Sequence, residues 1–151
     1  MSSHICTDRT RLDRDLIHDF LSRQAYWCRG IPRATVERAI EGSLCFGAYA
    51  SAAADAPQVG FARVVSDRAT FAYLCDVFVV TEYRGRGVGK ALLAAIDAHA
   101  DLQGLRRFLL FTADAYGLYQ RFGFTPLQHP ARGMERLNPT IYTADLHAQE
   151  N

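Results

Sequence analysis

The sequence lacks several features that would point to common functional classes. Its formal net charge is only +1, from 17 basic and 16 acidic residues, so the chain offers no general attraction to nucleic acid or to an anionic membrane. None of its apolar runs approaches the roughly 18 residues of a membrane-spanning helix, and its first residues lack the basic-then-apolar pattern of a signal peptide. We therefore expect a cytoplasmic protein that binds neither nucleic acid nor membrane.

The four cysteines are widely separated and form no C-x-x-C pair. This spacing argues against a zinc site and against a redox pair of thiols. Reduced thiols buried in a core are the simpler interpretation, and they agree with a cytosolic protein. No metal site is expected.

No internal repeat, linker or low-complexity segment divides the chain. Its 151 residues, of which 49% are hydrophobic, suit one domain over residues 1–151 with a single substantial core.

Hydrophobic periodicity predicts an α+β fold. Apolar residues at helical spacing follow Thr10, which resembles the start of a capping box, and Pro32 suits the first position of a second helix. Further helices are expected over 88–102 and 116–122. Runs of aromatic and β-branched residues predict strands near 4–7, 44–50, 59–65, 71–80, 108–112, 124–127 and 134–137. The expected sheet is mixed but mostly antiparallel, with about six to seven strands and about four flanking helices.

The run 108–112 is nearly continuous apolar sequence, as in a strand that is covered on both faces. It follows a strand, a turn and a helix, so a right-handed crossover would place it parallel to the strand at 71–80. The segment 134–137 is expected to pair antiparallel with its predecessor.

The most informative stretch is Arg84-Gly85-Arg86-Gly87-Val88-Gly89-Lys90, between the predicted strand 71–80 and helix 88–102. Its glycines let a ligand approach the backbone, and the first amides of a helix have no partner within the helix. The positive end of the helix dipole and three basic side chains favour an anion at the same place. The stretch therefore predicts a site for phosphate oxygens.

Spacing separates this stretch from two other phosphate-binding motifs. A Walker A loop would have glycine at Arg84 and a serine or threonine at Ala91. A dinucleotide fingerprint would have its third glycine at Lys90 and would follow a different strand pattern. Neither motif is present, so ATP and dinucleotides are not the expected ligands.

Two motifs together resemble the GNAT superfamily of N-acetyltransferases. Arg84-x-x-Gly87-x-Gly89 matches the [Arg/Gln]-x-x-Gly-x-[Gly/Ala] signature, and it follows an apolar strand that ends in Val77-Phe78-Val79-Val80. Downstream, Tyr119-Gln120-Arg121-Phe122-Gly123-Phe124 is similar to the Tyr-x-x-x-Gly-Phe segment of the family. The resemblance covers essentially the whole chain.

The resemblance implies acetyl-CoA as cosubstrate and no metal. Its pyrophosphate would bind Arg84, Gly85, Arg86, Gly87, Val88, Gly89 and Lys90, and its pantetheine arm would run along Val77, Phe78 and Val79. Addition of such an arm to a free strand edge is physically reasonable. The resemblance also implies that the parallel strands at the centre of the sheet splay apart, which would open a slot between Val80 and Thr112. Asp114 is assigned a contact with the cosubstrate.

One catalytic role follows from the same resemblance, and two more follow from the chemistry of acetyl transfer. Tyr119 would protonate the departing thiolate, because a phenol with a pKa of about 10 is protonated at neutral pH; packing beside the cosubstrate is the alternative, and Tyr116 is a neighbouring candidate. The N–H of Val79 would polarise the thioester carbonyl. Asp76 is assigned as a base, with binding of the charged acceptor or capping of a loop as alternatives.

The acceptor pocket is expected to be lined by Tyr26, Trp27, Asp76 and His129, although Tyr26 and Trp27 could instead pack between helices. Aromatic walls beside an acidic residue would suit an apolar or aromatic amine. The predicted function is direct transfer of an acetyl group from acetyl-CoA to a primary amine of a small molecule or peptide. The alternative is a non-catalytic module that senses CoA or an acyl-CoA, and a homodimer is left open.

Overall fold

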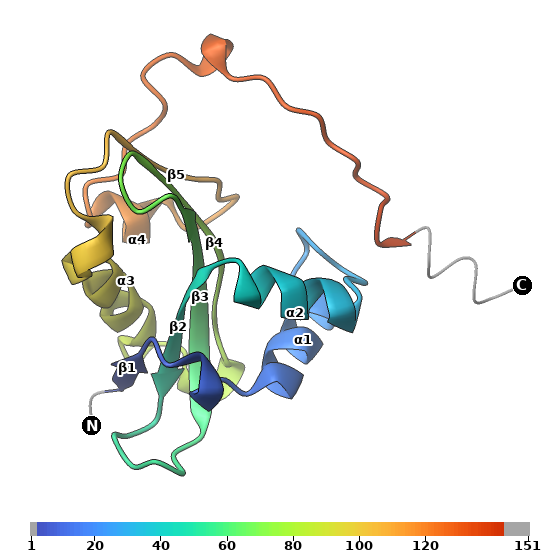
Figure 1. Cartoon of the computed structure of the whole chain (residues 1–151), viewed down its shortest axis with the longest axis vertical. Helices are drawn as coiled ribbons and strands as arrows, with labels where there is room; N and C mark the ends of the chain where they lie inside the picture. Colours follow the sequence, from blue (N-terminus) through green and yellow to red (C-terminus); the bar gives the residue numbers. More distant parts are fainter. Residues whose placement is uncertain (1–2, 144–151) are drawn as a thin grey trace, which may run out of the picture.

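The computed structural model describes residues 3–143 and contains a five-stranded sheet with helices on both faces (Figure 1). The strand order is β1-β2-β3-β4-β5; the first four strands pair antiparallel, and β5 is parallel to β4. The α+β class and the mixed sheet are therefore confirmed. The strands are β1 (His4–Cys6), β2 (Leu44–Tyr49), β3 (Gln58–Ser66), β4 (Phe71–Val79) and β5 (Arg107–Leu110).

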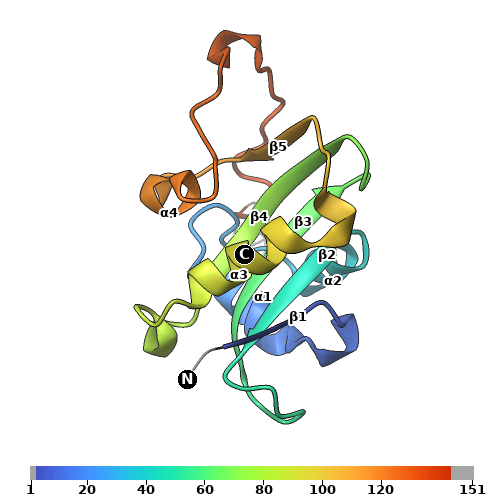
Figure 2. The same ribbon diagram turned by 90° about the vertical axis from the view of Figure 1, so that its left-hand side faces the viewer.

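Four α-helices accompany this sheet within the described residues, as expected. Figure 2 shows α3 lying across one face of the sheet and α4 beyond β5. The helices are α1 (Arg14–Arg23), α2 (Arg33–Glu41), α3 (Val88–Ala98) and α4 (Tyr116–Gln120), with 3₁₀ turns at Arg9–Arg11, Thr81–Tyr83, Ala100–Leu102 and Pro130–Arg132. None of the helices in residues 3–143 is both long and apolar enough to span a membrane.

The start of α1 differs from the prediction. Asp13 caps the helix, because its carboxylate accepts a hydrogen bond from the N–H of Leu16 at 3.0 Å. Thr10 lies in the preceding 3₁₀ turn, where its hydroxyl donates to Asp8 at 2.7 Å. A carboxylate is as good an N-cap as a hydroxyl, and the acid nearer to the helix takes the position.

Two groups of buried side chains hold the layers together. One packs α3 against the sheet and includes Phe46, Val64 and Leu92; the other packs α1 and α2 against the opposite face and includes Ile17 and Phe61. The sheet therefore separates two apolar layers, and the helical spacing of the apolar residues after Thr10 explains which side of α1 is buried.

The sheet has fewer strands than predicted. Residues 124–127 and 134–137 form no strand, so β5 lies at the edge and the parallel pair is not central. Pro126 has no N–H to donate to a ladder, and every residue from 125 to 141 is exposed. For the same reason Phe108, Leu109 and Leu110 of β5 are only partly buried instead of being covered on both faces.

The two parallel strands stay paired over only part of their length. Their ladder runs from Phe71 and Arg107 to Leu74 and Leu110, whereas β4 continues beside β3 as far as Val79. The second half of β4 is thereby left with an edge that β5 does not cover, and this part of the sheet positions the candidate site.

Candidate active site

A β-bulge in β4 marks the point where the parallel strands separate. The register between β3 and β4 shifts between Phe61 and Arg63, opposite Phe78 and Cys75, and Asp76 lies in the interval with a φ of 53°. Aspartate adopts such a left-handed conformation more readily than most side chains. The bulge gives the strand one extra residue at this point.

The carboxylate of Asp76 is held from two sides. One oxygen accepts from Nε1 of Trp27 at 2.9 Å, and the other accepts from Nε of Arg63 at 2.8 Å. The Asp76 and Arg63 side chains are only 10% and 19% exposed, and Arg63 also donates to Oγ of Ser43 at 3.0 Å. This network attaches the connector between α1 and α2 to the bulge.

Arg63 did not figure among the sequence-predicted site residues. The sequence does contain a signal for Arg63, because it is the one charged residue in the otherwise apolar segment Val59-Gly60-Phe61-Ala62-Arg63-Val64-Val65. A buried cation inside a strand needs a partner, and Asp76 is that partner.

A cavity of about 380 Å³ lies between the second half of β4 and the segment that follows β5. The structure brings six of the predicted site residues together on its walls: Tyr26, Trp27, Asp76, Val77, Asp114 and Tyr119. Sequence reasoning missed the further aromatic wall residues Tyr73 and Phe111, which pack edge to face with ring centroids 6.1 Å apart.

Tyr119 enters this cavity from α4. Its ring packs edge to face with Phe124 at 6.1 Å between centroids. Burial raises the pKa of its phenol above the ordinary value, and the negative charge of Asp114 adds to the shift. The hydroxyl therefore keeps its proton throughout the neutral range.

The backbone of β4 presents a free donor on the uncovered side. The N–H of Val80 donates to the carbonyl of Val59 on β3 at 2.9 Å. Successive backbone groups of a strand point to opposite sides, so the N–H of Val79 points away from β3. The carbonyl of Val79 points the same way and accepts from Nε of Arg84 at 3.2 Å.

The glycine-rich turn leads directly into α3. Gly85 and Gly87 have φ angles of 76° and 82°, which glycine adopts without strain. Among the described residues no side chain caps α3, and its first hydrogen bond runs from the N–H of Ala91 to the carbonyl of Gly87 at 3.0 Å. The amides before Ala91 are thus free to bind an anion.

Basic side chains surround these amides. Arg84, Arg86 and Lys90 are exposed, and the guanidinium of Arg86 lies 4.8 Å from the ring centroid of Tyr83. A Cβ added to Gly85 or Gly87 would meet no atom within 4 Å. The turn is therefore an open, positively charged cradle, and its residues fit the phosphates of CoA.

The start of α3 also contacts α4. A Cβ at Gly89 would lie 3.7 Å from Cδ2 of Leu118, and Leu118 precedes Tyr119. Val88 and Leu118 belong to the same apolar layer. The two sequence motifs, 30 residues apart in the chain, are therefore adjacent in space.

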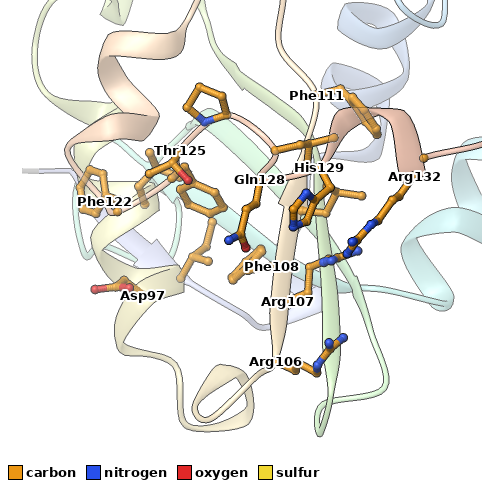
Figure 3. A pocket seen from close by; sticks show the side chains of 18 of the residues that line it. Asp97, Arg106, Arg107, Phe108, Phe111, Phe122, Thr125, Gln128, His129 and Arg132 are labelled. Atoms are coloured by element: carbon orange, nitrogen blue, oxygen red, sulfur yellow. The ribbon is translucent and has the colours of Figure 1, made fainter.

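Two predicted site residues lie elsewhere. The ring of Phe78 is buried and stacks on Phe20 with centroids 4.0 Å apart, so only its backbone can meet a ligand at the strand edge. His129 lines a different cavity, of about 730 Å³, on the other side of β5 (Figure 3). In the single chain the His129 loop therefore does not line the cavity that Tyr26 and Trp27 line, and its part in an acceptor pocket stays a prediction.

One thiol lines the cavity at Asp76. Burial raises the pKa of Cys75 to about 12, and its Sγ lies 3.6 Å from the carbonyl oxygen of Arg63. A thiol in this state is a poor nucleophile at neutral pH. Among residues 3–143 no group of three or more His, Cys, Asp or Glu side chains could hold a metal ion.

Comparisons with known proteins agree on one family. The acetyltransferase (GNAT) domain family matches residues 41–126. A crystal structure of a candidate GNAT acetyltransferase from Xanthomonas campestris pv. campestris is 55% identical, with a TM-score of 0.90 over 95% of this chain and 98% of that chain.

Two curated proteins are also similar. A candidate acetyltransferase of Gibberella zeae is 32% identical over 133 residues, which cover 76% of this chain and 74% of that protein. The N-alpha-acetyltransferase 80 of Mus musculus is 34% identical over 92 residues, which cover 60% of this chain and 29% of the mouse protein. The resemblance inferred from the glycine turn and the Tyr119 segment is confirmed: the chain belongs to the GNAT family of acetyltransferases.

Proposed function

We propose that this protein moves an acetyl group from acetyl-CoA directly to a primary amine of a small molecule or peptide. The observation that carries the proposal is the position of the protonated Tyr119 phenol in the cavity beside the uncovered edge of β4. GNAT enzymes use acetyl-CoA as cosubstrate, and the open glycine turn supports the same donor here.

The donor would be held at two places. The free amides and cations from Arg84 to Lys90 would bind its pyrophosphate, as anions bind at helix N-termini. The backbone from Val77 to Val79 would pair with its amide-bearing arm in the manner of an added strand. Asp114 lines the cavity beside β4 and is assigned a contact with the donor.

When bound, acetyl-CoA supplies an activated acetyl group as a thioester. The N–H of Val79, which points to the uncovered side of β4, would stabilise negative charge that develops on the carbonyl oxygen. Attack by the neutral amine forms the C–N bond and breaks the C–S bond. Tyr119 would donate its proton to the departing thiolate, and the proton lost by the amine would pass through water and restore the phenol.

Asp76 takes a different role in this scheme from the base expected at first. Both of its oxygens already accept hydrogen bonds, from Trp27 and from Arg63. We assign it the task of positioning the Trp27 wall and of adding negative charge to the side of the cavity that receives the amine.

The state of Cys75 supports direct transfer over an acetyl-cysteine intermediate. With a pKa of about 12, only about 1 in 10⁵ of these thiols is ionised at pH 7. An acetyl-enzyme route would need a thiolate as nucleophile.

Aromatic walls and acidic residues define the acceptor that the cavity would favour. Tyr26, Trp27 and Phe111 are 60%, 45% and 68% exposed, so their rings are available to a ligand. Rings of this kind bind apolar groups and cations alike. An apolar or aromatic primary amine fits these walls, and the name of the similar mouse N-alpha-acetyltransferase favours including peptide α-amines among the candidates.

The test is thiol release from acetyl-CoA across a panel of arylalkylamines, polyamines and peptides. Tyr119→Phe should lower kcat by about 100-fold or more, as expected for loss of a general acid. Tyr116→Phe is the matched control, because Tyr116 is 57% exposed on the same helix and does not line the cavity. It should leave kcat unchanged.

Two results would contradict the proposal. If no amine raises thiol release although CoA stabilises the protein, the non-catalytic sensor is the better account. A bound ligand at about 100 times its Kd adds about 2.7 kcal/mol to the free energy of unfolding, so a thermal shift detects that case. If Tyr119→Phe retains full turnover, the assignment of Tyr119 as the acid is wrong.

A further inference from the structure

The cavity between β4 and the segment after β5 has acidic walls. Asp76 and Asp114 both line it, and no lysine, arginine or histidine of the described residues does. A ligand that enters this cavity therefore meets carboxylates but no cationic wall residue, and the field inside favours a positively charged group.

The two carboxylates differ in what surrounds them. The charge of Asp76 is paired with Arg63 at 2.8 Å, and its other oxygen accepts from Trp27. Asp114 is exposed, and within residues 3–143 its carboxylate accepts no hydrogen bond and forms no ion pair. Asp114 therefore keeps a full charge for a ligand, whereas most of the charge of Asp76 is balanced.

The position of Asp114 is fixed by the turn before α4. The N–H of Ala115 donates to Oγ1 of Thr112 at 3.1 Å and closes this turn around Asp114. Tyr119 lines the same cavity. Burial raises the pKa of its phenol, and Asp114 lies near enough for its charge to add to the shift. The unpaired carboxylate is thus close to the proposed proton donor.

Aromatic rings form much of the remaining wall. Three of the five aromatic side chains that are exposed in the described residues line this cavity: Tyr26, Trp27 and Phe111. Tyr26 and Trp27 pack edge to face with ring centroids 5.1 Å apart. Aromatic faces attract cations, and a nearby carboxylate adds to the attraction. Together the rings and Asp114 have the composition of a site for an ammonium group.

The chemistry of acetyl transfer restricts which ammonium group can use this site. The attacking nitrogen must be neutral, but a free primary amine with a pKa of about 10 is mostly protonated at pH 7. A monoamine that binds Asp114 as a cation cannot attack. An acceptor with two basic nitrogens can leave one ammonium at the carboxylate while the other nitrogen, in its neutral form, attacks the thioester.

We propose that the acceptor is an aliphatic diamine or polyamine whose second ammonium binds Asp114 and the rings of Tyr26, Trp27 and Phe111. This inference rests on the proposed function and specifies its acceptor. The carbon chain between the two nitrogens packs against the aromatic walls. The contact of Asp114 with the donor is assigned to its backbone, which leaves the carboxylate for the acceptor.

The kinetic test compares cadaverine, pentylamine and aminovalerate, which have the same number of carbons and end in an ammonium, a methyl group and a carboxylate. Thiol release from acetyl-CoA gives kcat/KM for each amine with the wild type, Asp114→Asn and Asp55→Asn. Asp55 is exposed in the loop between β2 and β3 and does not line the cavity. Its variant therefore controls for the loss of one negative charge from the protein.

The wild type should prefer cadaverine to pentylamine by at least about tenfold in kcat/KM, because only the diamine makes the charge-assisted and cation–π contacts. Aminovalerate should be the poorest acceptor. Asp114→Asn should lose most of the preference for cadaverine, and Asp55→Asn should keep it. The ratio between two amines cancels any effect of a variant on the donor.

Binding is measured separately from turnover. Trp27 is the single tryptophan of the chain, so its fluorescence reports ligands in this cavity. In protein saturated with CoA, cadaverine should change the fluorescence with a Kd that rises by at least about tenfold in Asp114→Asn. If no amine releases thiol but this Asp114-dependent binding is observed, the transfer reaction is refuted and the ammonium site is retained.

Three results would overturn the inference. The first is a wild type that binds no cadaverine, or binds and acetylates it no better than pentylamine. The second is an Asp114→Asn protein that keeps the preference for cadaverine. The third is an Asp114→Asn protein that loses turnover equally with both amines, which would assign the carboxylate to the donor or to proton transfer. Circular dichroism verifies that each variant retains the fold.

Discussion

Asp76→Asn separates a positioning role for this residue from a role as catalytic base. Asparagine tolerates the left-handed backbone of the bulge as aspartate does, and its amide oxygen can still accept the N–H of Trp27. The change therefore removes mainly the negative charge beside Arg63. With a neutral residue at position 76, the charged guanidinium of Arg63 stays without a carboxylate partner in a site where the Arg63 side chain is only 19% exposed.

The size of the effect follows from this burial. Breaking a buried ion pair by removing one partner costs about 3 kcal/mol or more, because the remaining charge is desolvated without compensation. For a chain of this length each kcal/mol lowers Tm by about 2–4 °C, so a drop of about 6–12 °C is expected. Arg63→Met should cost a similar amount, and the double variant should lose less than the two single changes together.

Thermal and urea unfolding followed by circular dichroism measure the stability, and thiol release measures turnover. The positioning role predicts a raised KM for the amine with kcat little changed, because the side of the cavity that receives the amine loses its negative charge. Two results would refute the reasoning. A stability loss well below 1 kcal/mol would show that water screens the pair, and a fall in kcat of about 100-fold with an unchanged KM would show that Asp76 acts as the base.

Two further changes test the glycine-rich turn before α3 and the turn that joins β3 to β4. Gly87→Ala should lower the free energy of unfolding by about 1 kcal/mol, because alanine is strained at a φ of 82°, and it should weaken CoA binding measured by calorimetry. The control Gly117→Ala, at a helical position with open space, should change neither quantity. Equal CoA affinity in the Gly87 variant would contradict the role of the turn as a phosphate cradle. At Asp67, hydrogen bonds from the hydroxyl and amide of Thr70 and from neighbouring amides hold the carboxyl pKa well below its ordinary range. The stabilising effect of the ionised carboxylate is therefore complete above about pH 4 and declines as the pH falls further. The difference in stability between wild type and Asp67→Asn, measured by urea unfolding, should shrink below pH 4. A difference that stays constant with pH would refute the role of the ionised carboxylate.

Local sequence signals were sufficient for most of the framework. The strands around 44–50, 59–65 and 71–80 were expected within one or two residues of their observed bounds, because runs of aromatic and β-branched residues specify them locally. Helix α3 ends at Ala98, earlier than expected, because His99 adopts an extended backbone and its ring accepts from the N–H of Asp101 at 3.1 Å.

Features that depend on pairing between distant segments could not be predicted in the same way. The bulge at Asp76 has no local signal, since it results from the register of β3 against β4. The segments 124–127 and 134–137 have strand-like composition, but composition does not tell whether a neighbouring edge is within reach. The location of His129 depends on the same missing pairing.

The extra residue in β4 also changes which side chains the strand gives to each layer. Before the bulge, the even-numbered Ala72 and Leu74 face the α3 layer; beyond it, the odd-numbered Val77 and Val79 face that layer, and Phe78 faces α1 and α2. A single backbone irregularity thus inverts the parity of the strand halfway along its length. Deleting Asp76 would restore regular alternation along β4 and would leave Val77, Phe78 and Val79 facing the layers that they face now. The extra residue therefore contributes nothing to the packing beyond it, and its contribution is the carboxylate that accepts from Trp27 and Arg63.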